Sequence, residues 1–227
     1  MKSHKFTIFP FLNTNIAAAS NGDLFPLYYR LTYMRKNTML RSFSKGVYAD
    51  LEGQEIETVI ETESQDIRAL MALLTEMFTE PYDLPGIRVK YEVAQTSVLE
   101  TIDQNIRDVI SENLKSVQSE FGVAVHVGAY TDDYPLYVLM NAIEKLMPKE
   151  VEHVFGGSES YLNYLEDWLE VYPLGVQQPR IIDWLDISQI DKQFLKYLSG
   201  RYDSEEKVKE IMEGIFNLII TKINMPM

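Results

Sequence analysis

The sequence predicts an α+β protein in which an N-terminal three-stranded antiparallel sheet precedes a mainly helical, acidic domain with a short sheet. Three observations predict this class. Residues 1–49 hold short runs rich in β-branched and aromatic residues, whereas apolar residues recur at intervals of three and four beyond residue 52. The charge also changes sign, because residues 1–49 carry a net charge of +6 and residues 50–227 carry −19. We therefore predict two domains, a basic head at 1–52 and an acidic body at 53–227.

Three strands are expected in the head. The first covers KFTIFPFL (5–12), where apolar residues fall at both odd and even positions and indicate a mostly covered strand. Residues 13–23 are polar at both ends and contain a glycine, which is typical of a loop. The runs FPLYYRLTYMRK (25–36) and TMLRSFSKGVY (38–48) then predict a hairpin whose turn lies near Lys36 and Asn37.

A two-residue turn at that position fixes which side chains share a face of the hairpin. It places Tyr28 opposite Lys45, and Thr32 opposite Arg41. The first face then carries Leu27, Tyr29, Leu31, Tyr33, Leu40, Ser42 and Ser44. The second face carries Tyr28, Arg30, Thr32, Arg41, Phe43 and Lys45. We favour this register because it separates the aliphatic side chains from the cations, and a slip of one residue would exchange the two faces.

The body is expected to be mainly helical. An amphipathic helix begins near Gly53 or at Ser64, ends near residue 78, and is followed by a strand at 87–94. Ser97 is expected to cap a second helix, and the apolar run at 122–130 predicts a buried strand. The remaining apolar stripes predict helices at about 134–147, 160–171, 188–199 and 204–223, with Ser204 as the cap of the last one.

Composition excludes several classes of function. The chain has no cysteine, which excludes disulfides, thiolate nucleophiles and zinc-finger sites. It has no run of 18 apolar residues, so we expect no membrane-spanning segment and a cytoplasmic location. Neither a dinucleotide-binding G-x-G-x-x-G nor a phosphate-binding P-loop occurs, and we expect no cofactor.

The cationic face of the hairpin is the candidate binding site. Cations interleaved with aromatic residues on a sheet suit a phosphate backbone together with groove contacts, because arginine reaches both phosphates and guanine edges. The alternative is an ordinary solvated face with Lys and Arg outside. The candidate nucleic-acid-binding residues are Tyr28, Arg30, Arg35, Lys36, Arg41 and Lys45.

A resemblance supports the nucleic-acid interpretation. Residues 26–32 (PLYYRLT), followed by Ser44, Lys45 and Gly46, resemble the arm-DNA-binding domain of tyrosine recombinases of the Bacteroidetes conjugative-transposon and phage-integrase type. The resemblance covers residues 5–78, and the chain lacks the Trp that usually follows the third strand of that family. It implies a DNA-binding sheet in a protein of a mobile element or phage.

The rest of the chain does not match the catalytic part of such recombinases, which need a Tyr nucleophile beside cations that include an H-x-x-R element. The chain has three histidines, His4, His126 and His153, and none is followed by Arg three residues later. We therefore assign no catalytic or metal residue. An enzyme built on His126, Asp132 and Asp133 is a weaker alternative, and each histidine is otherwise interpreted as structural.

The body offers one further feature, a set of aromatic residues within 161–197. Its members are Tyr161, Tyr164, Trp168, Tyr172, Trp184 and Tyr197. Such residues are enriched in protein contacts, so this region is the candidate site for a protein partner or for self-association. Packing between helices is the alternative. The leading functional hypothesis is a non-catalytic DNA-binding accessory protein, and the competing one is an assembly subunit with no nucleic-acid role.

Overall fold

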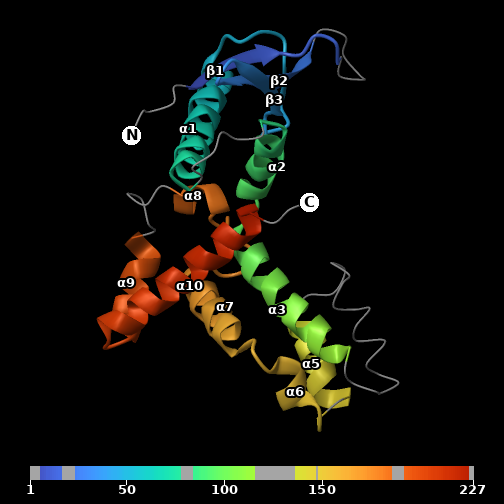
Figure 1. Cartoon of the computed structure of the whole chain (residues 1–227), viewed down its shortest axis with the longest axis vertical. Helices are drawn as coiled ribbons and strands as arrows, with labels where there is room; N and C mark the ends of the chain where they lie inside the picture. The colour runs from blue at the N-terminus through green and yellow to red at the C-terminus, as the bar shows by residue number, and fades with distance from the viewer. Residues whose placement is uncertain are drawn as a thin grey trace. The chain divides into compact units, whose positions relative to one another are not determined.

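The computed structural model describes residues 6–16, 24–77, 84–115, 136–146, 148–185 and 192–224. The chain forms two compact units (Figure 1). The first, the sheet unit, comprises residues 1–96 and 180–190, and the second, the helical unit, comprises residues 97–179 and 191–227. The predicted α+β class is confirmed, since an antiparallel sheet precedes a mainly helical region. The predicted boundary at residue 52 falls inside the sheet unit, because the two helices that follow the sheet pack with it.

The sheet has the strand order β1–β2–β3, with all pairs antiparallel. These strands span Phe6–Leu12, Phe25–Tyr33 and Lys36–Arg41. A two-residue strand, β4 (Val47–Tyr48), pairs with the beginning of β2 and was not expected. The central strand β2 is therefore the one whose side chains have neighbours on both sides.

The hairpin turn lies two residues earlier than the sequence analysis expected. Met34 and Arg35 both have positive φ angles, 48° and 66°, as a two-residue type I′ turn requires. Tyr33 consequently pairs with Lys36, and Tyr28 lies opposite Arg41 instead of Lys45. The predicted register was wrong by an even number of positions. Every strand residue therefore keeps its predicted face.

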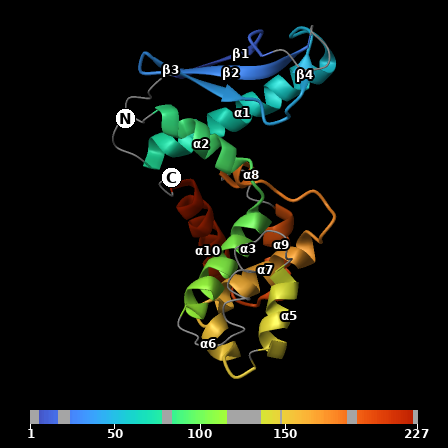
Figure 2. The same cartoon turned by 90° about the vertical axis from the view of Figure 1, so that its right-hand side faces the viewer.

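One face of the sheet is covered by helices and forms the core of the sheet unit. Figure 2 shows α1 (Gln54–Met77) and α2 (Leu84–Ala94) on the same side of the sheet. The side chains on this covered face are nearly inaccessible to solvent. They are Leu27, Tyr29, Leu31, Tyr33, Leu40 and Ser42. Burial, together with the Glu63 carboxylate of α1, raises the pKa of the Tyr29 hydroxyl above its ordinary value of 10.

The predicted strand at 87–94 was wrong, because these residues lie in α2. Ile87, Tyr91 and Ala94 are buried and recur at helical intervals of four and three. The segment is short, and its β-branched residues also fit the alternating pattern of a strand. The sequence pattern alone therefore favoured the wrong element. The preceding helix α1 begins at Gln54, which agrees with the earlier of the two predicted starts.

A return segment of the chain completes the sheet unit. Helix α8 (Ile181–Leu185) packs on α1 and α2, and Arg180 just before it bonds to residues of α1 and α8 and to the residue that follows α2. The Arg180 guanidinium lies 2.9 Å from Asp66, 2.6 Å from the Gln95 amide oxygen and 2.7 Å from Asp183. This arginine joins residues that are far apart in the sequence.

The helical unit contains the remaining described helices. They are α3 (Val98–Leu114), α5 (Leu136–Leu146), α6 (Val151–Phe155), α7 (Glu159–Val171), α9 (Lys192–Arg201) and α10 (Glu205–Asn224). The predicted caps are confirmed, since Ser97 and Glu100 form a reciprocal capping box and the Ser204 hydroxyl accepts from the Lys207 amide. The predicted strand at 122–130 lies outside the described residues.

Candidate nucleic-acid interface

Among the described elements of the sheet unit, none covers the face of the sheet opposite α1 and α2, and we call it the open face. The strand register arranges its side chains in three rows across β1, β2 and β3. The rows are Thr7–Thr32–Asn37, Phe9–Arg30–Met39 and Phe11–Tyr28–Arg41. Phe9 is 60% exposed and Met39 is 54% exposed. The open face thus combines aromatic and apolar side chains with two arginines and no acid.

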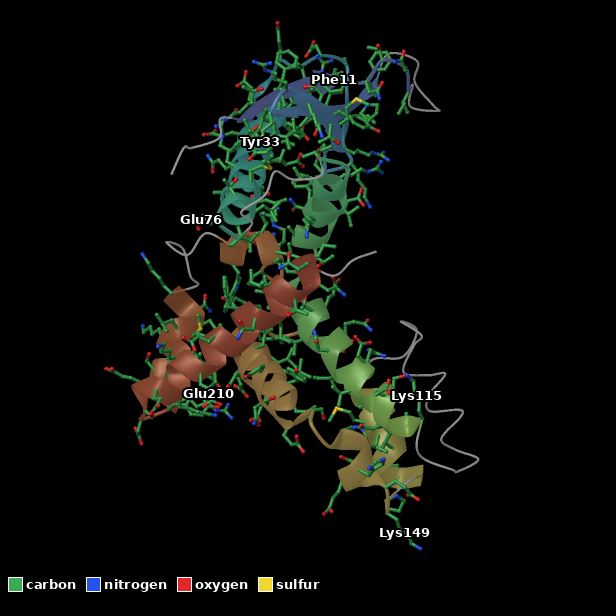
Figure 3. The ribbon with its side chains drawn as sticks, in the orientation of Figure 1. Phe11, Tyr33, Glu76, Lys115, Lys149 and Glu210 are labelled. Carbon is green, nitrogen blue, oxygen red and sulfur yellow. The ribbon has the colours of Figure 1, made fainter. Side chains whose placement is uncertain are left out.

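Planar groups are layered at the centre of the open face. The Arg30 guanidinium lies over the Phe11 ring, 5.5 Å from its centroid. The Phe11 and Tyr28 rings are in turn 6.0 Å apart and tilted by 37°. Figure 3 labels Phe11 of the open face and Tyr33 of the covered face. Because a cation over an aromatic ring is favourable, this contact orients Arg30 before any ligand binds.

The six predicted binding residues do not all lie on this face. Tyr28, Arg30 and Arg41 do, and both arginines are exposed. Arg35 is in the hairpin turn. Lys36 begins β3 opposite Tyr33 and therefore lies on the covered face, although its own side chain is exposed. Lys45 lies beyond the end of β3, in a turn where its φ angle is 54°.

The turn that carries Lys45 is fixed by a buried carboxylate. Glu63 of α1 is 5% exposed, and its Oε1 accepts hydrogen bonds from the Ser42 hydroxyl at 3.0 Å and from the Ser44 amide at 2.9 Å. The Ser42 and Ser44 hydroxyl oxygens are also 2.8 Å apart. A helix residue thus determines how the chain leaves β3, and Phe43, which is 47% exposed, projects from this segment.

The cations of the head are electrostatically available. Among the residues that the structure describes, none of Arg30, Arg35, Lys36, Arg41 and Lys45 forms an ion pair. The acids of the sheet unit lie elsewhere, since α1 alone carries six acids and one arginine. Because α1 is on the covered side, the sheet unit has a cationic face and an acidic back. This polarity would orient the unit on a polyanion.

Sequence reasoning missed the contribution of β1. It expected a mostly covered strand because apolar residues occupy both faces of β1. The helices cover only one face, however, and Phe9 and Phe11 lie in the same rows as Arg30 and Tyr28 on the other. No signal in the sequence distinguishes the two faces of β1, because both carry apolar residues.

Half of the six aromatic residues named at 161–197 are buried, namely Tyr164, Trp168 and Trp184, and the other three are partly exposed. Trp168 is fully buried, 4.9 Å from the Tyr172 ring and 5.2 Å from the Phe194 ring, and its indole NH donates to Gln178. Trp184 is buried in the sheet unit and so does not belong to this group. These positions favour the packing interpretation, and a protein partner at this region stays a prediction.

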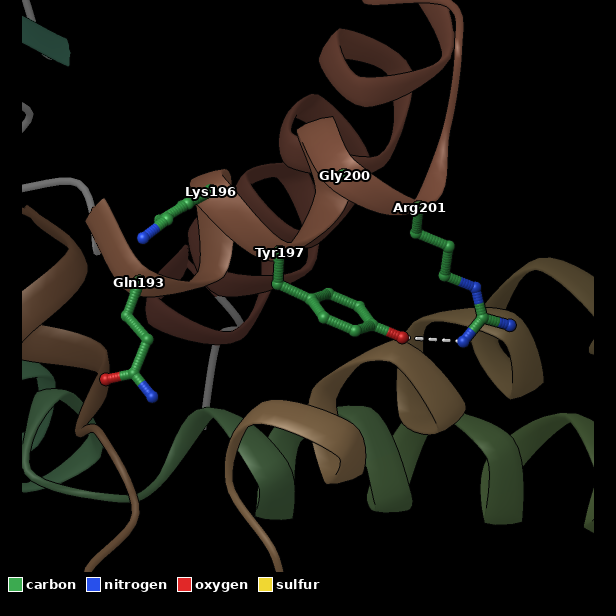
Figure 4. A pocket seen from close by; sticks show the side chains of 5 residues that line it. All are labelled: Gln193, Lys196, Tyr197, Gly200 and Arg201. Carbon is green, nitrogen blue, oxygen red and sulfur yellow. Dashed lines mark hydrogen bonds between the residues drawn. The ribbon is translucent and has the colours of Figure 1, made fainter.

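A shallow hollow on α9 has a volume of about 470 Å³. Figure 4 shows its lining, which comes from one helix: Gln193, Lys196, Tyr197, Gly200 and Arg201. The Arg201 guanidinium is already engaged by the Tyr197 hydroxyl at 2.6 Å, by Glu166 at 2.8 Å and by Asp167 at 3.2 Å.

No metal or membrane site emerges from the parts of the chain that the structure covers. Within them, no three His, Asp or Glu side chains converge as metal ligands, and no helix is long and apolar enough to span a bilayer. His126, Asp132 and Asp133 lie outside the described residues, and His153 is exposed on α6. Comparisons with protein-family models, curated proteins and solved structures find no match.

Proposed function

We propose that this chain is a non-catalytic DNA-binding accessory protein whose sheet unit contacts DNA through the open face. The observation that carries the proposal is the pairing of exposed Arg30 and Arg41 with aromatic rings on a face without acids. Exposed arginines supply phosphate and base-edge contacts, and aromatic side chains contact bases and sugars. The resemblance of residues 5–78 to arm-DNA-binding domains supports a role in a mobile element or phage.

The helical unit suits a different task. It carries twice as many acids as Lys and Arg residues, so it repels a polyanion. We assign protein contacts to this unit. The acidic surface would then limit DNA contact to the sheet unit.

The test uses the full chain and fluorescence anisotropy at low salt. The probe is a labelled DNA with a 20-bp duplex and a 12-nucleotide tail, so that paired and unpaired DNA are both present. We expect the Arg30→Gln, Arg41→Gln double variant to lose at least about fivefold in affinity for each arginine, since a base-contacting arginine contributes ~1–3 kcal/mol. Gln retains the polarity and much of the length of the side chain.

A charge-matched control separates a specific face from total charge. Lys209 of α10 is exposed and Lys207 is half-buried, and they lie 3.5 Å from Glu213 and 3.0 Å from Glu210. The Lys207→Gln, Lys209→Gln variant removes the same charge from the other unit and should bind like the wild type. Equal loss in both variants, or no binding by the wild-type chain, would refute the proposal and favour the assembly-subunit alternative.

A further inference from the structure

The open face carries more aromatic surface than a duplex ligand would use. Phe9 is the most exposed aromatic residue among the large exposed hydrophobic side chains of the described chain. In a duplex, each base is stacked between its neighbours, so a protein side chain reaches only base edges, sugars and phosphates. An unpaired base instead offers its ring face to an aromatic side chain.

The spacing of the aromatic residues also favours unpaired nucleotides. Phe9 and Phe11 are alternate residues of β1 and so lie about 6.8 Å apart along the strand. Consecutive bases in a duplex are about 3.4 Å apart, half of that distance. A duplex cannot match both rings to successive bases, whereas an unstacked strand is free to lengthen its base spacing.

A bound strand also needs cations beside its phosphate backbone, and the open face supplies them next to its rings. The Arg30 guanidinium lies over the Phe11 ring, the Phe11 ring is 6.0 Å from the Tyr28 ring, and Arg41 lies in the same row as these two rings. Arginine combines a planar surface for stacking with charge for phosphates. Aromatic platforms beside cations are the general means of binding single strands without reading base edges.

We propose that the ligand of the open face is single-stranded DNA, with one base stacked on Phe9, a second base against the Phe11–Arg30 layer, and Arg41 on a phosphate. This inference rests on the proposed function, because it specifies the form of DNA bound. Because the affinity then comes from stacking on the ring faces of the bases, we expect the base sequence of the DNA to change the affinity little.

The test compares two labelled probes with the full chain: a 12-nucleotide oligothymidine and a blunt-ended 20-bp duplex. The variant is Phe9→Leu, which keeps an apolar side chain but removes the ring. Because Phe9 is 60% exposed, its replacement should leave the stability of the fold nearly unchanged, which urea unfolding checks. The control is Leu174→Ala, which removes a 70% exposed apolar side chain from the helical unit.

We expect the single strand to bind more tightly than the duplex. Phe9→Leu should weaken oligothymidine binding about 5- to 150-fold, the equivalent of ~1–3 kcal/mol for one stacked base, and change duplex binding less than twofold. Leu174→Ala should change neither. Duplex binding as tight as single-strand binding, or equal effects of Phe9→Leu on both probes, would overturn this inference and leave the proposed function standing. Absence of binding to both probes would overturn both.

Discussion

Glu63 offers the sharpest test of how the sheet unit is built. The change is Glu63→Ala, which removes the carboxylate that joins α1 to the end of β3. The side chain is 5% exposed, and its Oε1 accepts from the Ser42 hydroxyl and the Ser44 amide. If the sheet and α1 form one cooperative unit, loss of this link should destabilise the whole unit and not only the turn.

The magnitude follows from these two contacts. A hydrogen bond to a charged group contributes ~1.5–3 kcal/mol, and removal of the acceptor leaves the nearly buried Ser42 hydroxyl and the Ser44 amide with fewer partners. The Ser42–Ser44 contact of 2.8 Å recovers part of this loss. We expect Glu63→Ala to lower the free energy of unfolding by about 2–4 kcal/mol. Glu61→Ala, at an exposed position of the same helix, should change it by less than about 0.5 kcal/mol.

The assay is urea unfolding followed by tryptophan fluorescence. The two tryptophans lie in different units, so a Trp168→Phe background leaves Trp184 as the reporter of the sheet unit. A double-mutant cycle between Glu63→Ala and Ser42→Ala should give a coupling free energy within about 0.5–3 kcal/mol. Equal stability of the Glu63→Ala and Glu61→Ala variants, or zero coupling with Ser42, would refute this reasoning.

Two further predictions concern the helical unit. A Cβ at Gly214 of α10 would clash with the Tyr164 hydroxyl, whereas a Cβ at Gly200 of α9 meets nothing within 4 Å. Gly214→Ala should therefore destabilise the unit by about 1–3 kcal/mol, and Gly200→Ala should stabilise it by about 0.5–1 kcal/mol; chemical denaturation of both variants checks this difference in sign. The second concerns Asp167, which is fully buried, and burial raises the pKa of its carboxyl above 3.8. The folded state then holds this proton more tightly than the unfolded chain, so the stability that Asp167 contributes is present below pH ~4 and declines as pH rises through the raised pKa. Asp167→Asn removes this decline. The difference in unfolding free energy between the wild type and the variant should therefore shrink between pH 4 and pH 8, and a constant difference would contradict a raised pKa of Asp167.

The faces of the hairpin are more predictable from the sequence than its register. Alternation of apolar and polar residues in β2 assigns each side chain to a face, and this assignment survives an even shift in pairing. The turn was misplaced because Met34 and Arg35 are unusual residues for positive φ angles, and Lys36 and Asn37 resemble turn residues more closely. Turn position depends here on packing across the sheet, which local sequence does not reveal.

The candidate site was recognised only in part. Arg30, Arg41 and Tyr28 were predicted on one face because all three lie in the hairpin, where pairing is local. Phe9 and Phe11 joined them only through the pairing of β1 with β2, which are separate segments of the chain. The link from Glu63 to Ser42 was likewise out of reach, because nothing in the sequence states which helix residue faces the end of a strand.

The salt dependence of binding tests the central claim most directly. The logarithm of the affinity of the full chain for oligothymidine, measured against the logarithm of sodium chloride concentration, should fall with a slope of about −0.7 for each cation that contacts a phosphate. Because Arg41 is the cation assigned to a phosphate, the Arg30→Gln, Arg41→Gln variant should have a slope shallower by about 0.7, while the Lys207→Gln, Lys209→Gln control keeps the wild-type slope. Identical slopes for the wild type and the arginine variant would contradict the claim that the open face binds DNA.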